Sequence, residues 1–134
     1  MTMRWFGPQI EARIREGANR GVMQWIGAVE QRAVDLINNP PKTGRIYRRG
    51  GVAHQASAPG EPPATDKGTL VNARRIDLIP EQLAARLTFT AKHAWYMQHG
   101  TRTIAPRPFA DRALNETLEE GQGFVRTEIA AALR

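Results

Sequence analysis

The sequence predicts an α+β domain in which a long N-terminal helix and a C-terminal helix pack on a small antiparallel β-sheet, with a long extended arm in between. Three observations predict this fold class. Apolar residues recur at helical spacing near both ends of the chain, a segment of the second half alternates apolar and polar residues, and a stretch rich in glycine and proline separates them. Because 134 residues suit one ordinary domain, we expect 1–134 to form a single unit.

The first helix is predicted from about Pro8 to Ile37. Its apolar positions fall at three- and four-residue steps, which places them on one helical face: Ile10, Ile14, Ala18, Val22, Trp25, Val29, Ala33 and Leu36. Three glycines inside this segment each weaken the helix by up to about 1 kcal/mol: Gly17, Gly21 and Gly27. We therefore expect packing to hold the helix, and a neighbouring subunit is one source of it. Asn38, Asn39, Pro40 and Pro41 end the helix.

The next segment, from Pro40 to about Gly68, is predicted to be an extended, flexible arm. Glycine and proline occur throughout it, apolar periodicity is weak, and basic residues outnumber acidic ones: Lys42, Arg45, Arg48, Arg49 and Lys67 against Glu61 and Asp66. Structureless segments of this length are uncommon inside compact domains and are usually functional or disordered. Two interpretations stay open, an arm that binds a partner and a surface loop that binds none.

A β-hairpin is predicted after the arm. Leu83, Ala85, Leu87, Phe89 and Ala91 occupy strictly alternate positions, as in a half-buried strand, and Pro80 with Glu81 supplies the turn before it. The first strand, within Leu70 to Ile79, is ambiguous at its start, because the apolar spacing there also fits a helical turn.

The C-terminal part begins with the short aromatic segment from His93 to His99, which Gly100 closes. Pro108 begins the last predicted helix, whose apolar stripe is Phe109, Ala113, Leu114, Leu118, Val125, Ile129 and Leu133. We expect Gly121 and Gly123 to bend or break this helix. Its carboxylates are expected mostly on the outer face, solvated or facing a partner: Glu116, Glu119, Glu120 and Glu128.

The net charge of +6 and the sequence pI of about 10.7 fit two interpretations: a polyanionic neighbour, such as nucleic acid, an acidic protein face or a membrane surface, or a soluble surface that merely leans basic. They do not choose among these. The absence of cysteine excludes disulfides and thiolate metal sites. No apolar run approaches the roughly 18 residues of a membrane span, and the charged start does not resemble a secretion signal.

Motifs for catalysis are sparse. The three histidines, His54, His93 and His99, have neither i,i+4 spacing nor carboxylates in a ligand pattern, and phosphate-binding glycine loops are absent. Ser57 with His54 is conceivable as a nucleophile and base, but both lie in the segment expected to be least ordered, whereas catalysis needs rigidly held groups. We therefore expect no catalytic residue, no cofactor and no metal site, and thus a protein that is not an enzyme.

Two stretches carry a recognisable pattern. The first is HAWYMQHGTRTIAPRPFADRAL, with an aromatic-containing turn, Gly-Thr, and Arg-Pro-Phe opening a helix; the second is PPKTGRIYRRGGVAHQASAPGEPPATDKGTLVNARRI. Together they cover somewhat less than half of the chain. They resemble the neck, or tail-completion, family of head–tail connector proteins in tailed bacteriophages, typified by the gene-ten product of a lambdoid phage. The residues that match the first pattern are Tyr96, Gly100, Thr101, Arg107, Pro108, Phe109 and Ala113. Gln98 stands where the family usually has an acid, a departure that weakens any ion pair built there.

The resemblance implies a structural virion protein that forms a homo-oligomeric ring at the head–tail junction. Its partners would be further copies of itself, head-completion or connector proteins, and the tail tube or tail terminator, with genomic DNA passing through the lumen in weak, non-specific contact. Assembly would take place in the host bacterial cytoplasm, without a membrane. We expect Arg45, Tyr47, Arg48 and Arg49 of the arm to contact a neighbouring subunit or partner. The alternatives are a basic nucleic-acid-binding protein of a mobile element and, third, a small metal-free ribonuclease.

Overall fold

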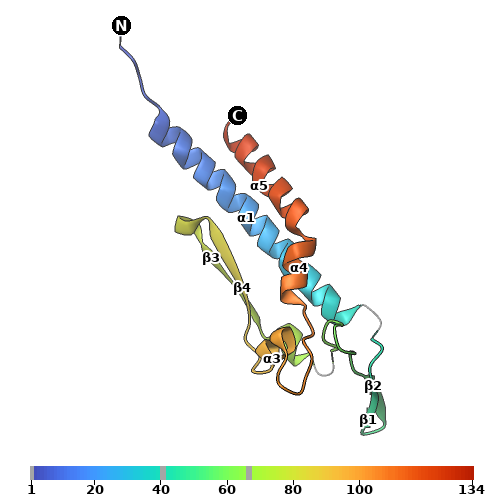
Figure 1. Ribbon diagram of the computed structural model, residues 1–134. Coiled ribbons are helices and arrows are strands. Elements are labelled where there is room, and N and C mark those ends of the chain that lie inside the picture. The colour runs from blue at the N-terminus through green and yellow to red at the C-terminus, as the bar shows by residue number, and fades with distance from the viewer. Residues whose placement is uncertain (1, 40–41, 66–67) are drawn as a thin grey trace.

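The computed structural model describes residues 2–39, 42–65 and 68–134, and it has the α+β fold that the sequence predicts (Figure 1). Its elements are α1 (Gly7–Asn38), β1 (Ile46–Arg49), β2 (Val52–Gln55), α2 (Thr69–Asn72), β3 (Arg74–Ile79), the 3₁₀ turn η1 (Pro80–Gln82), β4 (Ala84–Phe89), α3 (Ala94–His99), α4 (Ala110–Glu116) and α5 (Leu118–Ala132). The strands form two separate antiparallel hairpins, β1–β2 and β3–β4. Pro40, Pro41, Asp66 and Lys67, which belong to the predicted helix stop and arm, lie outside the described residues.

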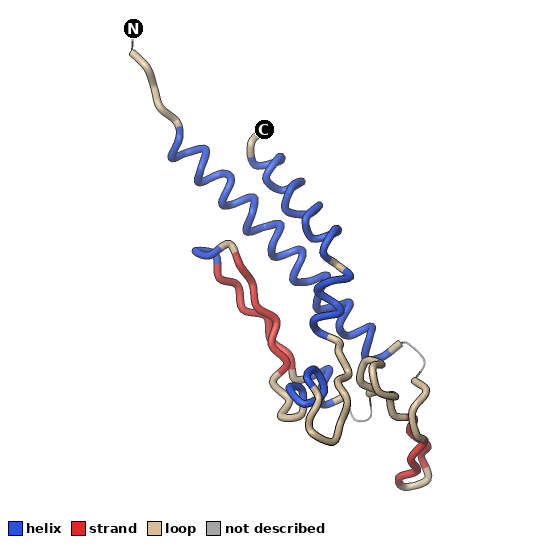
Figure 2. The backbone as a smooth tube through the Cα atoms, viewed as in Figure 1, coloured by secondary structure: helices blue, strands red, loops and turns tan. Residues whose placement is uncertain are grey.

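Helix α1 is the axis of the molecule. Helix α5 runs antiparallel beside its N-terminal half, α4 lies beside its C-terminal half, and the β3–β4 hairpin follows its other side (Figures 1 and 2). The C-terminal helices therefore divide their contacts. Helix α4 meets the sheet, where Ala113 packs near Leu87 and Phe89, whereas α5 packs on α1.

Glycines allow α1 and α5 to approach closely. A β-carbon at Gly21 would lie 2.5 Å from the Cα atom of Val125, and one at Gly17 would lie 2.7 Å from the carbonyl oxygen of Glu128. Real side chains cannot occupy such positions, so the backbones meet directly where the glycines stand. The packing expected to hold this glycine-rich helix thus comes from α5 of the same chain.

Ion pairs join α1 to both C-terminal helices. Arg20 donates to Glu128 at 2.9 Å, and Arg32 donates to Glu116 at 2.5 Å. Hydrogen bonds from Arg20 and Gln24 lower the pKa of the Glu128 carboxyl. Hydrogen bonds from Arg112 and Arg32 lower the pKa of the Glu116 carboxyl. Charge attraction by the arginines adds to both effects. Glu116 of α4 and Glu128 of α5 thus face α1 rather than the outer side expected of these carboxylates, because helical spacing alone does not reveal which side of a helix is covered.

The last helix is interrupted at Thr117 and not at the glycines. The Thr117 side chain is buried, and its hydroxyl donates to the Ala113 carbonyl at 2.9 Å and accepts from the Trp25 indole at 3.3 Å. Helix α5 continues through Gly121 and Gly123, so the expected break there is wrong. Gly121 instead makes room for Trp25, whose ring would lie 2.1 Å from a β-carbon at that position.

The β3–β4 hairpin pairs from Arg74↔Phe89 to Ile79↔Ala84, and its turn is η1 followed by Leu83 at φ 51°. The short helix α2 precedes β3, so the ambiguous segment contains both a helical turn and a strand. The apolar core lies where α1, α2, α3 and β4 converge, around Phe109, Leu36 and Ile37. No helix in the described part of the chain is both long enough and apolar enough to cross a membrane.

Candidate functional site

The predicted arm contains a hairpin of its own, which the sequence analysis missed. Strands β1 and β2 pair from Ile46↔Gln55 to Arg49↔Val52, and the turn uses Gly50 at φ 54° and Gly51 at φ 83°. The strands are short and of mixed polarity, so alternation along them is too weak to predict a strand. The clearer signal was the Gly-Gly pair between Arg49 and Val52, which is typical of a hairpin turn. The hairpin projects from the body beyond the C-terminal end of α1 (Figure 1).

The four arm residues singled out as contacts lie on or beside β1, and all four are exposed. The Arg45 guanidinium lies over the Tyr47 ring, 5.4 Å from its centroid. Because side chains alternate along a strand, Tyr47 and Arg49 lie on one face of the hairpin, together with His54, the cross-strand partner of Tyr47. Arg48 lies on the other face with Ile46. Their role as contacts to a partner stays a prediction.

Glu61 ties the two ends of the hairpin segment together. Its carboxylate accepts hydrogen bonds from the Thr43 hydroxyl, from the Thr43 N–H at 3.0 Å and from the Ala58 N–H at 2.9 Å. These bonds, the Thr43 hydroxyl first, lower the pKa of Glu61 to about 2. Backbone bonds from Gly44 to Ala56 and from Ala56 to Arg45, both 3.0 Å, continue the closure. We call residues 42–45 and 56–61 the arm root.

The segment that carries the sequence resemblance forms the connection from α3 to α4. Gly100 has φ 77°, and a β-carbon there would lie 2.7 Å from the Ile104 carbonyl oxygen, so the position requires glycine. Thr101 closes the following turn, because its hydroxyl accepts from the Ile104 N–H at 3.1 Å. Phe109 is buried and meets Phe89 edge to face at 4.9 Å, whereas Tyr96 is exposed.

Gln98 caps the N-terminus of α4. Its side-chain oxygen accepts from the N–H groups of Phe109 and Ala110, both at 3.1 Å, and its amide donates to Asp111 at 2.8 Å. The N-terminal N–H groups of a helix have no intrahelical acceptor, so this contact supplies one. Gln98 therefore satisfies backbone donors without a charge, which the residue pattern alone did not indicate.

A cavity of about 390 Å³ lies between the arm and the α2–α3 region. It gathers residues that are distant in the sequence, and its polar lining includes Tyr47, Arg49, His54, Ser57, His93 and Arg107. Ser57 is buried, and its hydroxyl accepts from the Arg107 guanidinium at 2.8 Å. Arg107 and Ser57 are 50 positions apart, so local sequence patterns do not bring them together.

Apolar side chains are exposed at two ends of the molecule. Before and within the first turns of α1, Met3, Trp5, Phe6 and Ile10 are exposed, and on the arm so are Ile46, Tyr47 and Val52. The first group lies at the N-terminal end of α1 and the second at the far end of the arm (Figure 1). We call them the N-terminal apolar end and the arm apolar end.

The described residues contain no group of three or more histidine or acidic side chains placed to hold a metal ion. Comparison of the chain with protein-family models, with curated proteins and with solved structures finds no match.

Proposed function

We propose that this chain is a structural subunit of a tailed-phage particle that assembles as a ring at the head–tail junction, as a neck or tail-completion protein. The phage assignment is supported by the resemblance of its two sequence segments. The ring is supported by the surface of the molecule. The protein would act in the virion, after assembly in the host cytoplasm, by joining the head connector to the tail rather than by catalysis.

The observation that carries the proposal is the amount of exposed surface. The chain has an accessible surface of 9470 Å², whereas a compact monomer of 14.9 kDa exposes about 7,000 Å². The difference, roughly 2,500 Å², is of the size that obligate subunit interfaces bury. The large apolar side chains exposed at both ends favour burial against other chains, because groups of such side chains mark interaction sites.

The positions of the two apolar ends favour a ring over a symmetric dimer. A ring requires one face of a subunit to match a different face of its neighbour, and the rotation between neighbours must close. The N-terminal and arm apolar ends lie at opposite ends of the elongated chain (Figure 1), which suits contacts between unlike surfaces.

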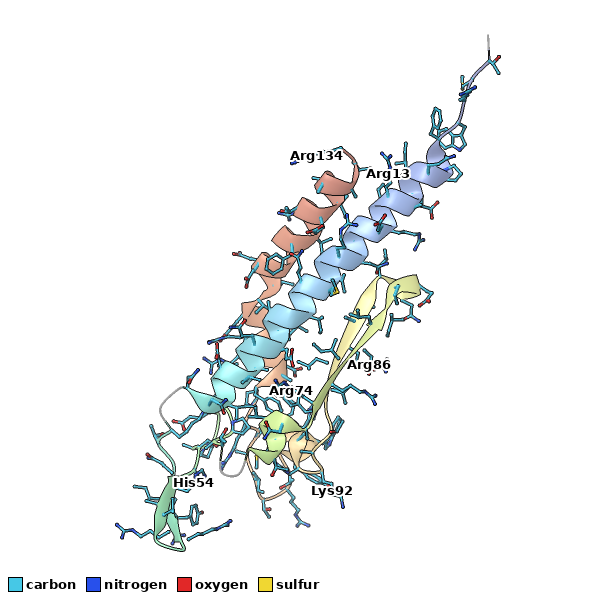
Figure 3. The ribbon with its side chains drawn as sticks, turned by 180° about the vertical axis from the view of Figure 1, so that it is seen from behind. Arg13, His54, Arg74, Arg86, Lys92 and Arg134 are labelled. Atoms are coloured by element: carbon cyan, nitrogen blue, oxygen red, sulfur yellow. The ribbon has the colours of Figure 1, made fainter. Side chains whose placement is uncertain are left out.

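The second candidate is a basic nucleic-acid-binding protein, and the exposed arginines of the arm favour it. Figure 3, however, shows that basic side chains also lie away from the arm, with Arg13 and Arg134 at one end of the molecule and Arg74 and Arg86 along its middle. Arg74 is also paired with Glu30 at 2.6 Å. Tight nucleic-acid binders concentrate such charge on one face. We therefore expect only weak, non-specific DNA binding, with Kd of about 10⁻⁴ to 10⁻⁶ M at physiological salt.

Deletion of the gene from its parent phage tests the proposal. A neck protein is needed for joining, so the lysate should hold DNA-filled heads and unjoined tails, or tails of defective length, in electron micrographs. Complementation with the intact gene is the control. Normal infectious particles from the deletion would refute the neck assignment.

A salt titration of DNA binding separates the two candidates. Each phosphate contact makes log K fall by about 0.9 per unit of log salt, so a dedicated binder has a steep slope and high affinity at low salt. Nanomolar binding at physiological salt, or a clear sequence preference, would favour the nucleic-acid candidate instead. Cleavage of RNA by the pure protein would point to the ribonuclease.

A further inference from the structure

The cavity beside the arm root has a lining that is rich in hydrogen-bond donors. Arg107 and Ser57 lie at its wall, His54 comes from β2, and His93 comes from the start of α3. Tyr47 adds a phenol, and Arg49 lines the cavity as well. No carboxylate is among the described residues that line it. The described lining of the cavity is therefore basic, and it includes no acidic side chain.

Arg107 is fixed in place yet incompletely hydrogen-bonded. Its backbone N–H donates to the Met97 carbonyl at 2.7 Å, and one terminal guanidinium nitrogen donates to the Ser57 hydroxyl at 2.8 Å. Its Nε is buried and has no hydrogen-bond acceptor in the described part of the chain. A buried unsatisfied donor costs about 1–3 kcal/mol and more for a charged group, so such a group calls for an explanation. The guanidinium carries five N–H groups, and Ser57 accepts from one of them, so donor capacity remains for a further acceptor.

The two histidines approach the cavity from different elements. His54 is half-buried on the hairpin, opposite Tyr47 in the strand register, and His93 precedes the first turn of α3. An imidazole ring offers an N–H donor when neutral and two when protonated. Together with the guanidinium and the two hydroxyl groups, they give donors on several sides of one space.

We propose that this cavity binds a phosphate group. A tetrahedral phosphate presents several strong acceptor oxygens to donors arranged around it, and arginine is the side chain best suited to it. The cavity of about 390 Å³ falls within the size range of small-molecule sites, so it has room for a phosphate group together with the molecule that carries it. The site does not require a ring, so its failure and the failure of the neck assignment are separate results.

The intact protein offers a test without mutation. Its only histidines are His54, His93 and His99, and the last does not line the cavity but lies against Trp95, with ring centroids 3.9 Å apart. Inorganic phosphate titrated at constant pH and ionic strength should shift the NMR signals of His54 and His93 saturably and leave those of His99 in place. No saturable shift, or an equal shift of all three, would refute the site.

Charge-matched variants give the second test. Arg107→Gln should weaken phosphate binding by about tenfold or more, because a charge-assisted hydrogen bond is lost. Arg102→Gln removes the same charge from an exposed position outside the cavity and should leave binding within about twofold. His93→Gln and His99→Gln form a second pair at exposed positions, with a loss expected only for His93. Circular dichroism checks that each variant is folded.

Calorimetry measures both pairs and also identifies the source of the phosphate. The probes are inorganic phosphate, a nucleoside 5′-monophosphate, a short DNA duplex, and acetate as a carboxylate control. The probe that binds most tightly and depends on Arg107 names the source. Equal losses in Arg102→Gln and Arg107→Gln would show an effect of net charge alone, and tighter binding of acetate than of phosphate would show a carboxylate site; either result overturns the proposal.

Discussion

The α1–α5 pair and the arm hairpin differ in what holds them. Helix α1 meets α5 backbone to backbone at Gly17 and Gly21, with Arg20 and Glu128 paired across the contact. In the β1–β2 hairpin, by contrast, every residue but His54 is exposed, and the closure lies at the arm root. The first region is specified by its own chain, whereas the second offers apolar and basic side chains that its own chain leaves exposed.

This difference assigns folding to the helix pair and association with other chains to the hairpin. Side chains buried in the helix pair contribute to the free energy of folding, so substitutions there should appear in unfolding measurements. Side chains exposed on the hairpin contribute little to folding, so substitutions there should appear in association measurements.

Gly21→Ala should be the most damaging single change. Its β-carbon would meet the Val125 backbone at 2.5 Å, and backbone cannot move aside as a flexible side chain can. We expect a loss of about 3 kcal/mol in the free energy of unfolding, measured by urea denaturation. Gly27→Ala is the matched control in the same helix. Nothing lies within 4 Å of its β-carbon position, so it should be neutral or stabilising by up to about 1 kcal/mol. Similar losses in both would disprove the close α1–α5 contact.

Gln98→Ala should cost about 1–2 kcal/mol, because two N–H groups at the start of α4 lose their acceptor. The control is Gln122→Ala, at an exposed position within α5, which should change stability by less than about 0.5 kcal/mol. Thermal and urea unfolding measure both. A Gln98→Ala variant as stable as the control would remove Gln98 from its role as the cap of α4.

Protonation or neutralisation of Glu61 should open the arm root while the helices stay intact. The pKa of this carboxyl is lowered from 4.5 to about 2, so its stabilising effect is complete above about pH 4.5 and is lost as the pH falls toward 2. At neutral pH, Glu61→Gln should speed tryptic cleavage after Arg45 and Arg48 several-fold and leave the melting temperature nearly unchanged. The exposed Glu119→Gln is the control. Equal cleavage rates in the two variants would contradict the role of Glu61.

Replacing Ile46–Gln55 with two glycines should have the smallest effect on stability. The Gly44–Ala56 and Ala56–Arg45 backbone bonds remain to close the shortened loop. We expect the free energy of unfolding to change by less than about 0.5 kcal/mol, while assembly with other chains is lost. A drop of several kcal/mol would mean that the hairpin belongs to the folding core.

The helices and the β3–β4 hairpin were predictable because their signals are local. Apolar spacing located α1 to within a residue at each end, and alternation located β4. The helix interruption was predicted at Gly121 and Gly123, which is wrong. A glycine indicates backbone freedom, but its presence does not reveal the packing of Trp25 against Gly121. Thr117 carries no such local signal. The interruption lies where its hydroxyl is buried against α1 and donates to the Ala113 carbonyl.

The cavity could not be predicted because it depends on long-range contacts. Ser57 and His54 were set aside as parts of an unstructured segment, yet Glu61 closes that segment and Arg107 holds Ser57. Neither contact leaves a trace in local periodicity. Among the residues matched by resemblance, Gly100 adopts a backbone conformation that disfavours a β-carbon, a role that fits a glycine closing a short segment.

Sedimentation equilibrium of the intact protein tests the central claim that the exposed apolar ends join neighbouring chains. The account predicts a mass that rises with concentration from 14.9 kDa towards a closed multiple of it. It also predicts a weaker association when the exposed Ile46 and Val52 are replaced by serine, with no loss of folding. A monomer of 14.9 kDa at every concentration that stays in solution, in the intact protein as in the serine variant, would contradict it.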